Sequence, residues 1–188
     1  MKKSSRNIRL FNSVRGMTVA AMLVALSVLI GIFCKTYLNF GMGLFRVTFE
    51  NLPIIMSGVL YGPIVGGVVG VCSDLVSYLF SNQAYPPNLW VTFGACAVGV
   101  VSGIMSKLII KRKCYGQIIF AGSAAHIVGS MIIKTIGLYS YYGGAVFVRV
   151  PLYLAIASLE ILVLCLLLGR RSFGRVVGYQ MDSERKWL

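Results

Sequence analysis

A single acidic residue, Asp74, lies inside a long apolar stretch of the sequence. The stretch runs from Asn51 to Asn88 and divides into two apolar segments at Tyr61-Gly62-Pro63. An aspartate in a helix surrounded by hydrocarbon costs about 2.5–3.5 kcal/mol unless a polar group meets it. Asp74 is therefore either part of a ligand site or a packing acid that bonds to a neighbouring helix, and both interpretations stay open.

A second polar pattern is formed by His126, Ser130 and Lys134, which recur every four residues and so mark one face of a helix. A lone histidine at such a position is more often a hydrogen-bonded packing residue than a ligand-binding one. Lys134 lies well inside the expected span, so it needs either a nearby anion or a route for its ammonium group to the surface. Glu160 is expected to be structural or to face a partner protein.

Isolated polar and aromatic residues gather in the half of the expected bundle that lies nearer the outer surface of the membrane. Such a set suits a flat, anionic small molecule, because aromatic side chains stack on rings, Lys or Arg pairs with carboxylates, and an acid or amide binds a heteroaromatic edge. We therefore predict an outward-facing pocket of net cationic character. Simpler roles remain open: Arg46 and Glu50 are four residues apart and could pair, and Trp90 could be an interfacial anchor. The candidate ligand-binding residues are Arg46, Glu50, Asn51, Asp74, Tyr78, Gln83, Tyr85, Trp90, Lys134, Tyr139, Tyr141, Tyr142, Arg149 and Tyr153.

These residues need a membrane-embedded scaffold to position them. Of the 188 residues, 57% are hydrophobic and 12% charged, and the mean hydropathy is +0.82. This composition indicates one polytopic, all-α membrane domain over residues 1–188. We expect a six-helix bundle whose first helix is retained rather than cleaved as a signal peptide, with basic segments at 1–16 and 170–188. The expected spans are 17–37, 48–60, 64–80, 89–110, 117–138 and 145–168, with an outer loop at 139–144.

The net charge of +13 is concentrated in three segments of the chain. Five of the 18 basic residues precede the first span, four lie together at or just after the end of the fourth span, and five follow the last. With six spans all three groups lie on one side, so the positive-inside rule places both termini in the cytoplasm. The charge then reflects orientation and contact with lipid headgroups, and no nucleic-acid partner is expected. The five cysteines are scattered without a CxxC pair, so neither a disulfide framework nor a metal site is indicated.

Small residues mark two helix faces that other helices could approach closely. Gly66 and Gly70 form one face, and Asp74 and Tyr78 continue it at the same spacing, so we expect Asp74 to face the bundle. The other face lies on the first span. It is either an internal packing surface or a docking surface for a partner protein, and its residues are Thr18, Ala21 and Ala25.

Several motifs of enzymes and autonomous carriers are missing from the sequence. It contains no P-loop, no HExxH or GxSxG motif, and no visible inverted repeat. No catalytic residue, cofactor or metal is therefore expected, and a pocket without its own energy source suggests a binding subunit. Two alternatives from other classes are a small membrane enzyme acting on lipid and an assembly protein without a ligand.

The pattern of a small-residue first helix followed by LPIIMSGVLYGPIVGGVVGVCSDLVSYLF resembles the substrate-binding S components of energy-coupling factor (ECF) vitamin transporters. The later stretch HIVGSMIIKTIGLYSYYGGAVFVRVPLYLAIASLE is most similar to the folate-specific members of that family. The resemblance covers nearly the whole chain. The first motif recurs among several vitamin specificities, so S components for pantothenate or riboflavin remain the alternative.

The resemblance implies a multi-pass protein of the bacterial plasma membrane that captures folate from outside. It further implies a transmembrane coupling subunit and two cytoplasmic ATPases as partners, with the S component toppling in the bilayer to deliver its ligand. The first-span face at Ala21 and Ala25 would be the docking surface. Arg149 and Lys134 would recognise the anion, and Asp74 or Glu50 the aminopyrimidine edge.

Overall fold

The computed structural model describes residues 14–40, 45–80, 89–109, 114–144 and 149–170. The described chain is helical apart from a two-residue antiparallel pairing between β1 (Asn39–Phe40) and β2 (Phe45–Arg46). The α-helices are α2 (Val14–Tyr37), α3 (Asn51–Tyr61), α4 (Pro63–Phe80), α5 (Leu89–Ile104), α6 (Tyr115–Ala125), α7 (Lys134–Tyr142) and α8 (Arg149–Gly169). Two π-helical segments, η1 (Met105–Ile109) and η2 (His126–Ile133), extend α5 and join α6 to α7.

Five helical stretches are long and apolar enough to cross a membrane: Gly16–Tyr37, Pro63–Phe80, Leu89–Lys107, Tyr115–Tyr139 and Val150–Gly169. They confirm an all-helical membrane protein. Helix α3, which falls in the second expected span, has only 11 residues and so extends about 16 Å, roughly half of the hydrocarbon core. The count of six full spans therefore stays a prediction.

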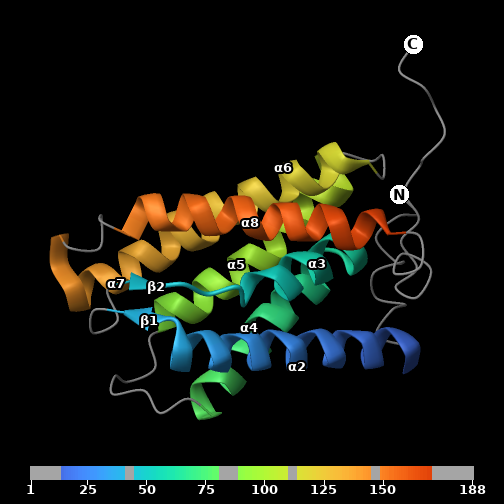
Figure 1. Cartoon of the computed structure of the whole chain (residues 1–188). Coiled ribbons are helices and arrows are strands. Elements are labelled where there is room, and N and C mark those ends of the chain that lie inside the picture. The colour runs from blue at the N-terminus through green and yellow to red at the C-terminus, as the bar shows by residue number, and fades with distance from the viewer. Residues whose placement is uncertain (1–13, 41–44, 81–88, 110–113, 145–148, 171–188) are drawn as a thin grey trace.

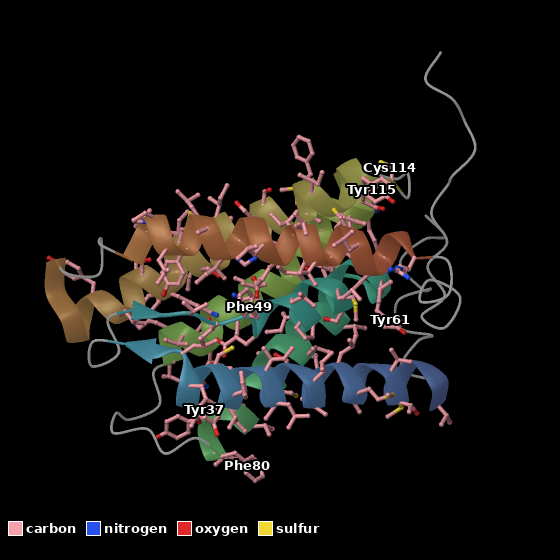
Figure 2. The ribbon with its side chains drawn as sticks, viewed as in Figure 1. Tyr37, Phe49, Tyr61, Phe80, Cys114 and Tyr115 are labelled. Atoms are coloured by element: carbon pink, nitrogen blue, oxygen red, sulfur yellow. The ribbon has the colours of Figure 1, made fainter. Side chains whose placement is uncertain are left out.

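Helix α3 is enclosed by the other helices, and ten of its 11 residues are buried. It contacts α2, α4, α5, α6 and α8, and Figure 1 shows it lying between α2 and α8. Phe49, just before α3, lies about halfway along the bundle, whereas Tyr61 lies toward one end (Figure 2). The start of α3, next to Phe49, therefore lies near the middle of the bundle's length.

Glycines allow α4 and α5 to approach until their backbones touch. A Cβ at Gly66 would collide with the carbonyl oxygen of Gly99, and one at Gly70 with that of Ala95. Lipid tails are as apolar as the helices, so no hydrophobic effect pulls two helices together in a membrane. Close van der Waals contact between their backbones does so instead, and glycine makes that contact possible. The small-residue face predicted on the third span is confirmed, and it is α5 that packs against it.

The C-terminal end of α3 is fixed by polar groups from η1 and α6. Tyr61 is the last residue of the helix, and its carbonyl oxygen accepts a hydrogen bond of 2.5 Å from the Lys107 ammonium. The Ser106 hydroxyl donates to the carbonyl oxygen of Val59 at 3.1 Å, and the Gln117 amide donates to the carbonyl oxygen of Ser106 at 2.5 Å. A cation at this position also complements the negative end of the helix dipole.

Helical backbone continues farther at the C-terminal end of α7 than the sequence indicated. The expected loop 139–144 is wrong over its first four residues, because α7 runs to Tyr142 and Gly143 ends it with a φ of 56°. Glycine adopts this left-handed conformation without the penalty of a Cβ.

The first residue of α2 and the last of α8 lie at the same end of the bundle, opposite β1 and β2 (Figure 1). This arrangement agrees with termini on one side. Which side of the membrane they face stays a prediction.

Candidate functional site

Lys134, at the first position of α7, is buried and reaches across to the start of α3. Its ammonium donates to Asn51 Oδ1 at 3.0 Å and lies 3.6 Å from Glu50 Oε1. The Asn51 amide in turn lies 3.5 Å from Ser130 Oγ, to which it donates. The anion that Lys134 required is therefore Glu50, and snorkelling to the surface is not how this lysine is accommodated. We call Glu50, Asn51, Ser130 and Lys134 the polar cluster.

A glycine on α5 makes room for the aliphatic stem of Lys134. A Cβ at Gly94 would lie 2.5 Å from Lys134 Cγ and 3.0 Å from the carbonyl oxygen of Gly129. The lysine therefore passes over Gly94 on its way to α3. Close contact between α5 and the η2–α7 helix brings its ammonium within reach of Asn51.

The side of Glu50 away from Lys134 is bounded by α2 and α4. A Cβ at Gly31 would lie 3.1 Å from Glu50 Oε2 and 2.8 Å from Ser77 Oγ. The buried Ser27 hydroxyl donates to the backbone carbonyl oxygen of Glu50 at 2.7 Å. Four helical elements therefore surround one half-buried carboxylate near the middle of the bundle.

Asp74 belongs to the interface between α4 and α5. It is half-buried, and its Oδ2 accepts a hydrogen bond of 2.6 Å from the Thr92 hydroxyl. The expectation that Asp74 faces the bundle is confirmed. Its hydrogen bond to Thr92 is the neighbouring-helix contact of a packing acid, whereas Glu50 is the acid that lies within the polar cluster.

A buried acid–histidine contact joins α8 to the start of η2. His126 Nε2 and Glu160 Oε2 are 2.7 Å apart, and the two side chains are 4% and 0% exposed. The structural interpretation of both residues agrees with this contact. Because His126, Ser130 and Lys134 share one helix face, the pair and the polar cluster are connected along a single stripe.

The aromatic candidates differ in their surroundings. Tyr78 and Tyr153 are half-buried, while Trp90 and Tyr139 are more than half exposed. The Cβ of Trp90 packs where a Cβ at Gly137 would stand, so α5 and α7 touch there. Gln83 and Tyr85 lie outside the described residues. So do the side chains of Arg46, Tyr141, Tyr142 and Arg149.

The predicted docking residues Thr18, Ala21 and Ala25 are all exposed on α2. The opposite face of this helix, with Leu23 and Ser27, is buried. Within the described part of the chain, none of the three residues is therefore buried against another helix. Their role in contacting a partner stays a prediction.

Several residues that build the site were not singled out from the sequence. Thr92 donates to the Asp74 carboxylate, Ser27 donates to the backbone carbonyl of Glu50, and Gly94 makes room for the stem of Lys134. A buried hydroxyl or glycine is common in membrane helices, so its type alone carries little information. The useful signal would have been that each lies on a helix face with other small or polar residues.

A family model described as "ECF transporter, substrate-specific component" matches residues 15–178. The "Folate transporter FolT" of Clostridium novyi (strain NT) is 27% identical over 127 residues, covering 65% of this chain and 70% of that protein. The "Uncharacterized protein MG098 homolog" of Mycoplasma pneumoniae is 35% identical over 66 residues, covering 35% of this chain and 13% of that protein.

Among solved structures, the crystal structure of FolT bound with folic acid superposes with a TM-score of 0.60 at 16% sequence identity. The match covers 91% of this chain and 98% of the other. At this identity the likeness concerns the fold, which the two proteins share over nearly their whole lengths. The family match extends over most of the described bundle, including the polar cluster. The chain belongs to the substrate-specific components of ECF transporters.

Proposed function

We propose that this chain is a folate-binding S component, which captures folate outside the bacterial plasma membrane and delivers it through an ATP-driven coupling module. The observation that carries the folate assignment is the similarity to a folate transporter over 65% of the chain. The shared fold with FolT supports it. ATP hydrolysis would occur in two cytoplasmic partner subunits, which a transmembrane coupling subunit connects to this chain.

The polar cluster supports a polar ligand rather than a lipid substrate. Buried charges inside a membrane bundle are costly, and they are typically placed where a substrate pathway or binding site needs them. Here Glu50, Asn51 and Lys134 come from two separate helices and meet at mid-depth. They offer both acceptors and donors, as the amino and carbonyl groups of a pterin ring require.

The geometry favours one division of roles among the candidates. Glu50 and Asn51 would bind the aminopyrimidine edge, and Lys134 would orient them, since its ammonium is already committed to both. Arg149 would then bind the carboxylates of the glutamate tail. The aromatic candidates, including Trp90, would contact the planar rings.

Ligand identification on the purified protein tests the proposal most directly. Native mass spectrometry should detect folate that survives purification, and calorimetric titration of ligand-free protein should show folate binding in preference to pantothenate and riboflavin. Preferential binding of either of those two vitamins would contradict the folate assignment. Failure to bind any vitamin would favour the assembly-protein alternative.

Removing the proposed carboxylate ligand tests the assignment of Arg149. Arg149→Ala should weaken folate binding at least tenfold, about 1.4 kcal/mol, because a charge-assisted pair would be lost. The matched control is Arg170→Ala, one residue beyond the end of α8. An effect of Arg149→Ala below threefold would refute the role.

The docking surface on α2 would be tested with bulky replacements. Ala21→Phe and Ala25→Phe should abolish folate uptake by the assembled transporter while leaving folate affinity unchanged, because both positions are exposed. The control is Leu29→Phe, at another exposed position of α2. Loss of folate binding with intact assembly would overturn the assignment.

A further inference from the structure

Helix α8 presents apolar residues to the bundle and to its outer surface alike. Its buried face carries Ile156, Ala157, Leu164 and Leu168, and its exposed face carries Leu154, Leu159, Leu162, Val163 and Leu166. Lipid tails are as apolar as leucine, so no hydrophobic force distinguishes these two faces in a membrane. Apolar packing alone therefore leaves the rotation of α8 about its axis weakly determined.

Glu160 is the one charged residue between Val150 and Gly169, and its contact favours one rotation of α8 over the others. Its carboxylate is 0% exposed and lies 2.7 Å from His126 Nε2. Turning α8 about its axis would separate the two groups and leave a carboxylate without this partner in an apolar environment. Leaving a buried polar group without its partner costs far more than exchanging one apolar contact for another.

The rotation of α8 decides which residues at its outer end face the bundle. Tyr153 and Arg149 precede Glu160 by seven and eleven residues, or about two and three helical turns. The three positions therefore share one helix face. His126 in turn begins η2, the segment that carries Ser130 and leads into Lys134 of the polar cluster.

We infer that the His126–Glu160 pair is a positioning element of the ligand site, which sets the rotational register of α8 and so directs positions 149 and 153 toward the polar cluster. The pair acts at a distance from the ligand, through the helix that carries those residues. This inference deepens the proposed function for Arg149. The register itself is independent of which ligand the protein binds.

The register can be measured without any ligand. In a protein whose five cysteines are replaced by alanine, a nitroxide label is placed in turn at each position from 152 to 159. The oxygen accessibility of the label should vary with the helical period, lowest at the buried Ile156 and Ala157 and highest near the exposed Leu154 and Leu159. Glu160→Leu should shift the phase of this curve.

Two further variants separate the pair from general packing. Glu160→Gln keeps an oxygen that can accept from the imidazole N–H, so the phase should stay as in the wild type. Leu164→Ala removes a fully buried side chain one turn away and should lower the unfolding temperature without a phase shift. An unchanged phase in Glu160→Leu would overturn the inference. Should that variant not fold, His126→Leu takes its place under the same criterion.

Folate titration tests whether the register matters for binding. Glu160→Leu should weaken folate binding at least tenfold in the wild-type background and less than threefold when Arg149→Ala is already present. Glu160→Gln should stay within threefold of the wild type. Equal losses in both backgrounds would show that Glu160 does not act through Arg149. If the wild type binds no folate, the proposed function fails, and the phase measurement still decides the register.

Discussion

The two ends of α3 are held in different ways. Toward its C-terminal end, Gly58 lies against the backbone of α5, where an added Cβ would collide with Gly99 and Gly103. At its start, Glu50 and Asn51 meet Lys134 through side-chain atoms alone. Backbone contact leaves no freedom for rearrangement, whereas polar side chains can exchange one partner for another. A single helix thus joins a rigid backbone contact at one end to a cluster of polar side chains at the other.

The largest effect is expected from removing the cation of the polar cluster. Lys134→Met keeps the stem over Gly94 but removes the ammonium from Glu50 and Asn51, so we expect about 3–5 kcal/mol of destabilisation. Thermal unfolding in detergent measures it. Adding Glu50→Gln removes the negative charge and should recover more than half of the loss. If the double variant recovered no stability, the charge balance between Lys134 and Glu50 would not be what stabilises the start of α3.

A slightly smaller effect is expected at the rigid backbone contact. A Cβ at Gly99 would collide with the carbonyl oxygen of Gly66, so Gly99→Val must force α4 and α5 apart, at a cost of about 3 kcal/mol. Thermal unfolding again provides the measurement. Gly144→Val is the control, because nothing lies within 4 Å of a Cβ there. Equal unfolding temperatures for Gly99→Val and Gly144→Val would contradict the claim that close backbone contact makes the α4–α5 interface rigid.

An intermediate effect is expected where α4 meets α5 beside Asp74. Thr92→Val keeps the shape of the side chain but removes the donor to Asp74 Oδ2, which should cost about 1–3 kcal/mol because the carboxylate is half-buried. Thr92→Ser keeps the hydroxyl and serves as the matched control. If Asp74 is only a packing acid, the affinity for folate should stay within threefold in both variants. A tenfold loss of affinity in Thr92→Val alone would instead bring Asp74 into the ligand site.

The smallest effect is expected at the C-terminal cap of α3. Lys107→Met removes the donor to the Tyr61 carbonyl, worth about 1 kcal/mol, while Ser106 still holds the last turn through Val59. The unfolding temperature should fall slightly and folate binding should not change. A loss of binding would show that the C-terminal cap and the polar cluster are coupled more tightly than their separate contacts suggest.

Much of the scaffold could be predicted because membrane helices have a direct signature in sequence. Long apolar runs located four of the spans to within a few residues, and glycines at four-residue spacing identified the face of α4 that meets α5. The end of α7 was missed because a tyrosine-rich, glycine-terminated segment resembles a loop. The short length of α3 was visible, but its enclosure by five other helices was not.

The sequence by itself determined that this protein is a helical membrane bundle, and that His126, Ser130 and Lys134 share one face. Both follow from local hydropathy and helical period. Only the tertiary structure decided the partners. It joined Lys134 to Asn51 across 83 positions, and it brought Glu160 to His126 rather than to any residue near it in the chain. Such pairings depend on how helices are arranged and rotated around α3, and no periodicity within one helix carries that information.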